Sequence, residues 1–230
     1  MEKKVEVLCA WSGAAFCVVF GIGFALIAQF VPPTSPALRA VEVAALYDQR
    51  RTAILAGAMV CFIGNGFFLP WTAVVSIVLW RTGFRLLSLV QLLGGGLGAM
   101  GPFLGTILWI AAGFRADQDP RVVQALNDVA WLFTIAYFIP VFFQFVAVGL
   151  AGLMATEQAR PWPRWMGYLS LWCATLAWPA VFIPFFKTGP FAWDGVLAFW
   201  VPLVAFFGWF VAMVPLVLRS VRQAAPSVRP

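Results

Sequence analysis

Carboxyl groups are the side chains of this chain best suited to acid–base chemistry, because its 230 residues include nine Asp and Glu and no His. Without His, a Ser–His–Asp triad, a His-ligated zinc site and a haem with an imidazole ligand are excluded. Six acids fall on one side of the membrane topology derived below, and two of them, Asp117 and Asp119, alternate with arginines in a solvated loop and carry little weight as a site. Four candidates remain on that side. They are Glu42, Asp48, Asp128 and Asp194.

Asp194 is the first candidate for a general acid, and Asp128 and Glu42 are further candidates or partners that hold its proton. Burial in an apolar pocket would keep such a carboxyl protonated and able to donate. The alternative for Asp128 and Asp194 is structural, since an acid in the first turn of a helix is stabilised by the helix dipole. The sequence leaves both interpretations open.

The elements that must position these acids are membrane-spanning helices. Apolar residues make up 63% of the chain, charged residues 10%, and the mean hydropathy is +0.91. A soluble domain has about 45–50% apolar and about 25% charged residues, so a soluble globular fold is excluded. Because a helix needs about 20 apolar residues to cross a bilayer, we predict an all-α integral membrane bundle with six spans. They are expected at residues 9–31, 53–80, 86–114, 125–154, 166–186 and 190–218.

The basic residues predict the orientation of these spans. Six Lys and Arg residues fall on the side of the four acids, and nine fall on the side of the termini: Lys3, Lys4, Arg81, Arg85, Arg160, Arg164, Arg219, Arg222 and Arg229. Positive residues accumulate on the cytoplasmic side, so we expect a multi-pass protein of the cell (inner) membrane with both termini inside. The net charge of +6 is thereby explained by loops, and no nucleic-acid partner is expected.

Residues 35–51, between the first two spans, are too long for a simple hairpin. Ser35 followed by Pro36 resembles a helix N-cap with proline at the first helical position. Leu38, Val41, Ala45 and Leu46 then recur at near-helical spacing between polar residues. We predict a short amphipathic helix on the outer surface; a solvated linker is the alternative.

Prolines and glycines predict how the spans pack. Five spans carry interior prolines, which bend helices, and so many bends suggest helices that splay around a space. The alternative is that these prolines only shape ordinary helix packing. Gly94 and Gly98, and again Gly101 and Gly105, have the spacing that lets helix backbones approach closely, which predicts that the third span is a central packing helix.

Aromatic side chains predict the character of that space. Five Trp residues and many Phe residues fall within the spans, at Trp71, Trp172, Trp178, Trp200 and Trp209, and at Phe67, Phe68, Phe138, Phe142, Phe143, Phe145, Phe182, Phe206 and Phe207. A cavity with aromatic walls would suit a bulky apolar ligand or a transient carbocation, whereas aromatic packing without a cavity is the alternative. In such a cavity we expect Tyr47, Trp131, Trp193 and Trp200 to surround the substrate and Asn65 to orient it. For Asn65, interhelical hydrogen bonding is the alternative.

The chain resembles the small membrane-bound terpene cyclases, including the bacterial ones that act on prenylated indoles. Four stretches resemble a group of small polytopic membrane proteins without His that are common in high-GC bacteria: VPPTSP at 31–36, EVAALY at 42–47, LNDVAW at 126–131 and FFKTGPFAWD at 185–194. The resemblance to the terpene cyclases lies in size, span number and aromatic content, and no catalytic residue is carried over from it. It implies that an acid protonates a terminal alkene or epoxide of a prenylated substrate, and that ring closure through cations and a deprotonation follow. No diphosphate leaves in such a reaction, so neither a metal ion nor another cofactor is expected.

Three functions remain as hypotheses. The first is a membrane-embedded terpene cyclase or isomerase with an apolar, prenylated or terpenoid substrate taken from the lipid bilayer. The second is a non-catalytic membrane subunit or scaffold, with the glycine faces as contact surfaces. The third is a transporter of a small apolar solute. The sequence has no obvious internal repeat and few charged residues inside the spans, and both observations count against this hypothesis. The oligomeric state does not follow from the sequence.

Overall fold

Long apolar stretches between proline- and glycine-rich breaks fold into helices throughout this protein. The computed structural model describes residues 2–115 and 117–223, is 81% helical, and has no strand among those residues. The α-helices are α1 Glu2–Gly21, α2 Ala40–Gly66, α3 Phe68–Arg81, α4 Arg85–Phe114, α5 Pro120–Trp131, α6 Ile139–Met154, α7 Arg164–Leu176 and α8 Val201–Gln223. Three short π-helices, η1 Ile22–Ile27, η2 Leu132–Ala136 and η4 Val196–Trp200, and one 3-10 helix, η3 Trp178–Phe185, adjoin them.

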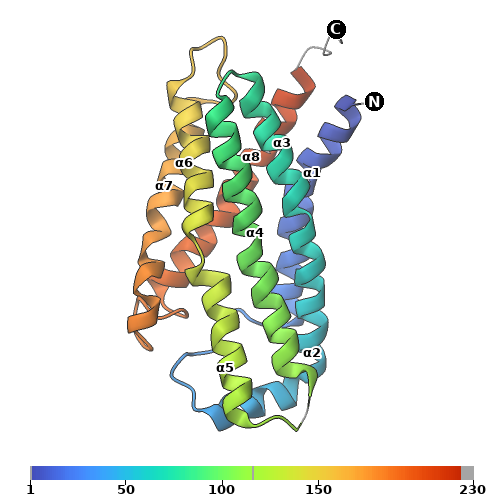
Figure 1. Ribbon diagram of the computed structural model, residues 1–230, viewed down its shortest axis with the longest axis vertical. Helices are drawn as coiled ribbons and strands as arrows, with labels where there is room; N and C mark the ends of the chain where they lie inside the picture. Colours follow the sequence, from blue (N-terminus) through green and yellow to red (C-terminus); the bar gives the residue numbers. More distant parts are fainter. Residues whose placement is uncertain (1, 116, 224–230) are drawn as a thin grey trace.

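Six helical stretches of the described chain are long and apolar enough to cross a membrane, which confirms the predicted all-α membrane bundle. They cover Glu2–Ile27, Ala40–Arg81, Arg85–Phe114, Pro120–Met154, Arg164–Phe185 and Val196–Gln223. Helix α1 begins and α8 ends at the same end of the bundle, which we call the terminal end (Figure 1). The opposite end, which carries residues 28–39 and the start of α5, is the loop end. Arg229, one of the basic residues used for the orientation, lies outside the described residues.

The predicted surface helix is the first part of α2, and a kink at Arg50 (φ −116°, ψ 18°) separates it from the membrane span. It begins at Ala40 and not at Ser35, because Glu42 accepts a hydrogen bond from the backbone N–H of Arg39 (2.7 Å) and caps the helix there. Ser35 instead accepts from the backbone N–H of Ala37 (3.4 Å) in a local turn. The buried face is formed by Val43 and Tyr47, one helical turn apart.

Prolines interrupt four of the spans. Helix α2 ends at Gly66, four residues before Pro70, and η2 ends at Ala136, four residues before Pro140. In the same way, α7 gives way to η3 just before Pro179, and the π-helical η4 gives way to α8 just before Pro202. Proline lacks an N–H and clashes with the carbonyl four residues earlier, so regular hydrogen bonding stops in the preceding turn. The predicted bends are therefore present as breaks at these four places, whereas Pro102 lies inside the continuous helix α4 and Pro215 inside α8.

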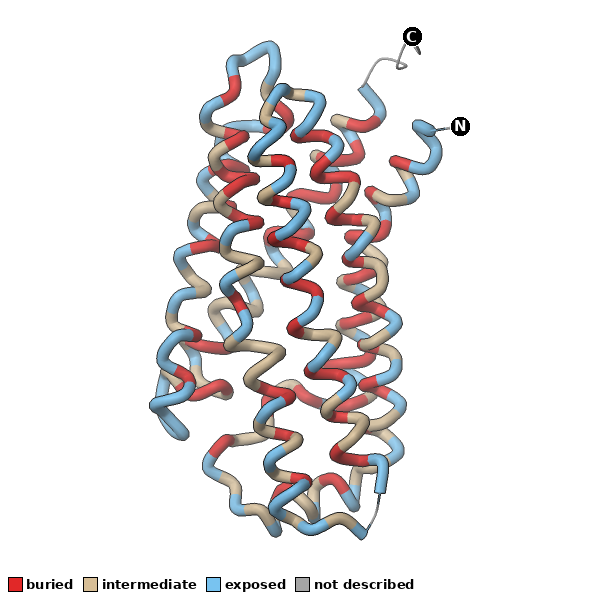
Figure 2. The backbone as a smooth tube through the Cα atoms, viewed as in Figure 1, coloured by how far each residue is buried: buried red, intermediate tan, exposed pale blue. Residues whose placement is uncertain are grey.

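Helix α4 is the central packing helix, as its glycines predict, and it contacts α2, α3, α5 and α6 (Figure 1). A Cβ atom on Gly94 would lie 2.7 Å from the carbonyl oxygen of Pro140, and one on Gly98 would lie 2.5 Å from the side chain of Val141, both on α6. Gly101 and Gly105 meet η2 and the end of α5 equally closely. Figure 2 shows buried residues recurring along the helices between exposed ones.

A partly buried ion pair joins α1 and α3 at the terminal end. The guanidinium of Arg81 donates to both carboxylate oxygens of Glu6, at 2.6 and 2.7 Å. The side chain of Glu6 is 8% exposed, whereas that of Arg81 is 39% exposed and reaches the surface.

Candidate ligand-binding site

A partly open cavity of about 160 Å³ lies between the helices, and all six spans contribute to its lining. The breaks in the spans border it. Asn65 precedes the break between α2 and α3, Phe138 lies between η2 and α6, Ala177 lies between α7 and η3, and Pro202 lies where η4 meets α8. The cavity therefore lies at the level of these breaks in the spans.

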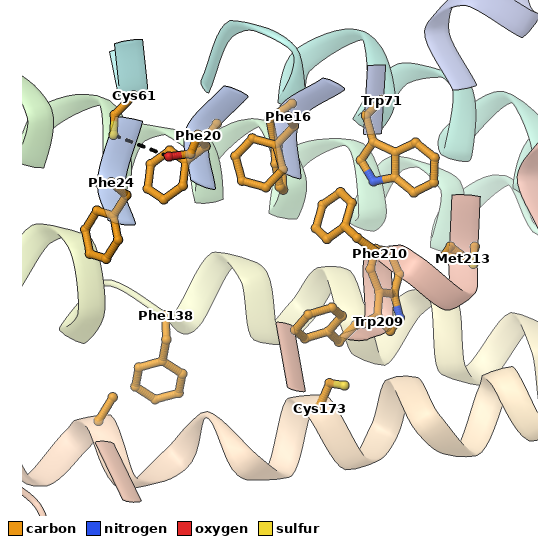
Figure 3. Packing of buried hydrophobic residues seen from close by; sticks show 14 of the residues in the cluster. Phe16, Phe20, Phe24, Cys61, Trp71, Phe138, Cys173, Trp209, Phe210 and Met213 are labelled. Atoms are coloured by element: carbon orange, nitrogen blue, oxygen red, sulfur yellow. Dashed lines mark hydrogen bonds between the residues drawn. The ribbon is translucent and has the colours of Figure 1, made fainter. Parts of the chain in front are cut away.

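Aromatic rings form a large part of the wall. Ten of the lining residues are aromatic: Phe16, Phe20, Phe24, Phe68, Tyr137, Phe138, Phe145, Phe199, Phe206 and Phe207. The first three follow one another at intervals of four residues on α1 and η1, so their rings form a row, with centroids 5.6 and 5.4 Å apart. Figure 3 shows this row on one side and Phe138 across from it. The cavity therefore offers π faces from opposite sides.

Toward the terminal end, a second aromatic group of Trp71, Trp209 and Phe210 packs beside the cavity (Figure 3). Phe210 contacts Phe16, with ring centroids 5.2 Å apart. The indole N–H of Trp209 donates to the hydroxyl of Ser170 (2.9 Å), which satisfies a donor that would otherwise be costly so deep in the bundle.

Toward the loop end, Phe24 and Phe199 meet a cluster that we call the ring plug, formed by Phe30, Trp109 and Trp131. The rings of Phe30 and Trp109 are 4.5 Å apart, and those of Trp109 and Trp131 are 5.0 Å apart. Trp109 and Trp131 are completely buried. The ring plug thus separates the cavity from the loop end.

Hydrogen bonds hold residues 28–39 over the ring plug. The indole of Trp131 donates to the hydroxyl of Thr34 (3.0 Å), and that of Trp193 donates to the Thr34 carbonyl (2.7 Å). Arg50, at the kink of α2, donates to the carbonyls of Ala28 (2.7 Å) and Gln29 (2.9 Å). This segment therefore connects the spans that carry Arg50 and Trp131 with the turn that carries Trp193.

Few polar atoms face the cavity. Thr134 donates its hydroxyl to the carbonyl of Ala130 (2.8 Å), and the thiol of Cys173 donates to the carbonyl of Ala205 (3.5 Å). Tyr137 is 37% exposed. Asn65 is 1% exposed, and its side-chain nitrogen Nδ2 has no hydrogen-bond partner among the described residues.

Asn65 is the one member of the predicted site that lines this cavity. Tyr47 is buried between α2 and α5, where its hydroxyl donates to Oδ1 of Asn127 (3.2 Å). Trp131 belongs to the ring plug, and Trp193 holds Thr34. Trp200 is 37% exposed and touches the cavity only through Phe199, whose ring centroid lies 5.3 Å away.

The three candidate acids lie outside the lining. Asp128 is half-buried and accepts a hydrogen bond from the Asn127 amide (3.3 Å), which extends the contact between Tyr47 and Asn127. Asp194 is half-buried in the turn before η4. Glu42 pairs with Arg39 at 2.9 Å and caps α2. No Asp or Glu of the described residues lines the cavity.

Sequence reasoning missed the row of Phe16, Phe20 and Phe24, although its four-residue spacing was the available signal. Of the five Trp residues that fall within the spans by sequence, Trp172 and Trp178 are 61% and 47% exposed. A helix that is apolar all round does not indicate which of its faces points inward.

Among the described residues, no three or more His, Cys, Asp or Glu side chains are close enough to hold a metal ion. The cavity can enclose an apolar group among its π faces and present the Asn65 amide to it.

Comparisons of the chain with protein-family models, with curated proteins and with solved structures found no match.

Proposed function

We propose that this membrane protein binds a bulky apolar small molecule, of terpenoid or prenylated type, in the cavity between its spans. The observation that carries the proposal is the cavity itself, with ten aromatic residues in its lining and one buried amide without a partner among the described residues. Small-molecule sites are typically concave, mostly apolar and furnished with few polar groups.

The volume supports a ligand group of modest size. An engineered apolar protein cavity of about 150 Å³ holds one benzene molecule. A cavity of about 160 Å³ therefore accommodates one ring or one branched five-carbon unit, and because it is partly open a longer molecule can extend from it. An apolar ligand that is dissolved in lipid has already left water, so the hydrophobic effect contributes little to its binding. Its affinity depends instead on close packing against the rings. Branched and cyclic groups fit this requirement better than a straight acyl chain.

Cyclisation of the bound group is a narrower proposal, and the aromatic wall favours it because π faces stabilise cations. The proton would come from Asp128 or Asp194. Both lie outside the lining, toward the loop end and beyond the ring plug, so the substrate would have to extend its alkene or epoxide to them.

We also propose that the protein lies in the cell membrane with both termini in the cytoplasm, because basic residues are in excess at the terminal end.

The binding proposal is tested by filling the cavity. Ala99 lies on α4, lines the cavity and is 3% exposed, so Ala99→Phe places a ring in the ligand's space. Leu97 is on the same helix but is 52% exposed and outside the lining, which makes Leu97→Phe the matched control. The three proteins are extracted into lipid nanodiscs, and co-purifying small molecules are identified by mass spectrometry.

We expect the wild type and Leu97→Phe to carry the same apolar compound in addition to bulk phospholipid, and Ala99→Phe to lack it. A folded wild type that carries only bulk phospholipid, or an Ala99→Phe variant that carries the compound undiminished, would contradict the binding proposal and favour a scaffold function. For cyclisation, Asp194→Asn and Asp128→Asn should accumulate an open-chain compound where the wild type carries a cyclic one. Full turnover in both variants would refute the acid assignment.

A further inference from the structure

Asn65 differs from the other buried polar groups of the bundle. Several side chains have buried nitrogen or oxygen atoms without a hydrogen-bond partner among the described residues, and of these only Asn65 lines the cavity. Gln144 and Thr72 belong instead to the close contact of α3, α4 and α6. There, a Cβ atom on Gly95 would lie 2.5 Å from the Thr72 hydroxyl and 3.0 Å from Nε2 of Gln144.

The position of Asn65 follows from its neighbours in the chain. A Cβ atom on Gly64 would lie 2.7 Å from the backbone nitrogen of Phe20, so α2 lies directly against α1 at this level. Helix α2 then ends at Gly66, at the break before Pro70. Asn65 is thereby held beside the row of phenyl rings, with its amide at the wall of an otherwise almost apolar space.

We propose that the ligand carries one hydrogen-bond acceptor oxygen, of carbonyl or epoxide type, and that Nδ2 of Asn65 donates to it. This inference rests on the proposed binding function and specifies its ligand class. An amide NH₂ group only donates, so its partner must accept. A buried donor without a partner is costly, and a ligand with a suitably placed oxygen removes that cost, whereas a pure hydrocarbon leaves it in place.

The test compares two small probes with the same carbon skeleton. 6-Methyl-5-hepten-2-one carries a ketone, and 2-methyl-2-heptene lacks it. Each probe is titrated into wild type, Asn65→Leu and Tyr137→Phe in nanodiscs, and Kd is measured by native mass spectrometry. Dividing the two Kd values within each protein and comparing this ratio between proteins removes the unequal partition of the probes into lipid. Tyr137→Phe is the matched control, because Tyr137 and Thr134 carry the hydroxyls of the lining and that of Thr134 already donates to Ala130.

One hydrogen bond to a neutral group changes affinity by roughly 3- to 10-fold. We therefore expect the preference of the wild type for the ketone to fall by about that factor in Asn65→Leu and to persist in Tyr137→Phe. The infrared carbonyl stretch of the bound ketone should be lowered in the wild type and should return toward its value in alkane in Asn65→Leu. If Asn65→Leu does not fold, Asn65→Ala provides the same comparison.

An unchanged preference and carbonyl stretch in a folded Asn65 variant would overturn the assignment while leaving the binding function intact. A preference lost in Tyr137→Phe and kept in Asn65→Leu would also overturn it. Failure of the wild type to bind either probe would refute the binding function itself.

Discussion

The contact between α4 and α6 makes a strong prediction about two glycines that are only two residues apart. A Cβ atom on Gly94 would lie 2.7 Å from the Pro140 carbonyl oxygen and 2.8 Å from the backbone nitrogen of Gln144, whereas a Cβ atom on Gly96 meets no atom within 4 Å. Ordinary contact begins at 3.4 Å, so Gly94→Ala requires the two helices to separate by about 0.7 Å. Because both contacted atoms belong to the backbone, no side-chain rotation relieves the overlap.

Overpacking of this kind costs about 1–3 kcal/mol. Gly96→Ala meets no obstacle and gains helix propensity of up to about 1 kcal/mol. We therefore expect the two variants to differ in free energy of unfolding by about 2 kcal/mol or more, with Gly94→Ala the less stable. Reversible unfolding by SDS in mixed micelles, followed by tryptophan fluorescence, measures this difference. Equal stability of the two variants would refute the packing of α4 described above.

Two further predictions concern the ends of the bundle. Thr34→Val removes the acceptor of the buried Trp131 indole N–H, so we expect the free energy of unfolding to fall by about 1–3 kcal/mol and backbone hydrogen exchange in residues 28–39 to accelerate. Unchanged exchange in this segment would show that the hydrogen bond does not hold it. Glu6→Gln breaks the bidentate pair with Arg81, and we expect the free energy of unfolding to fall by about 1–2 kcal/mol. This loss is smaller than for a fully buried pair, because the guanidinium still reaches the surface. A double-mutant cycle with Arg81→Gln measures the coupling, and a coupling near zero would contradict this account.

The architecture could be predicted because its signals are local. Runs of apolar residues determine the spans, prolines follow each of the four breaks although Pro102 leaves α4 unbroken, and the paired glycines indicate close packing of α4, as Gly94 and Gly98 illustrate. The start of α2 was misplaced because Ser35 and Pro36 form a plausible cap by themselves. The chain instead uses the capping interaction of Glu42 with Arg39. Which of two caps so close in sequence is used depends on the tertiary contacts of the segment, and the sequence alone does not show those contacts.

The candidate site was harder to predict, because it depends on which face of each helix points inward. Asn65 was recognised as an amide at depth, and it lines the cavity. Asp128 and Asp194 were selected because they share one side of the membrane, but sharing a side does not bring residues to the same cavity. They lie at the loop end, outside the lining. Phe16 and Phe20 were overlooked because phenylalanine is common throughout the chain, and only their common helical face distinguishes them.

The central claim is that an apolar molecule occupies the cavity between the spans, and photocrosslinking tests it most directly. A small isoprenoid ketone carrying a diazirine is irradiated with the wild-type protein in nanodiscs, with and without excess unlabelled ketone, and labelled residues are mapped by peptide mass spectrometry. We expect labels on lining residues from different spans, such as Phe20, Phe138 and Phe199, and we expect excess unlabelled ketone to remove these labels. Labels confined to outward-facing side chains such as Leu97 and Val204, and unaffected by competition, would contradict the central claim.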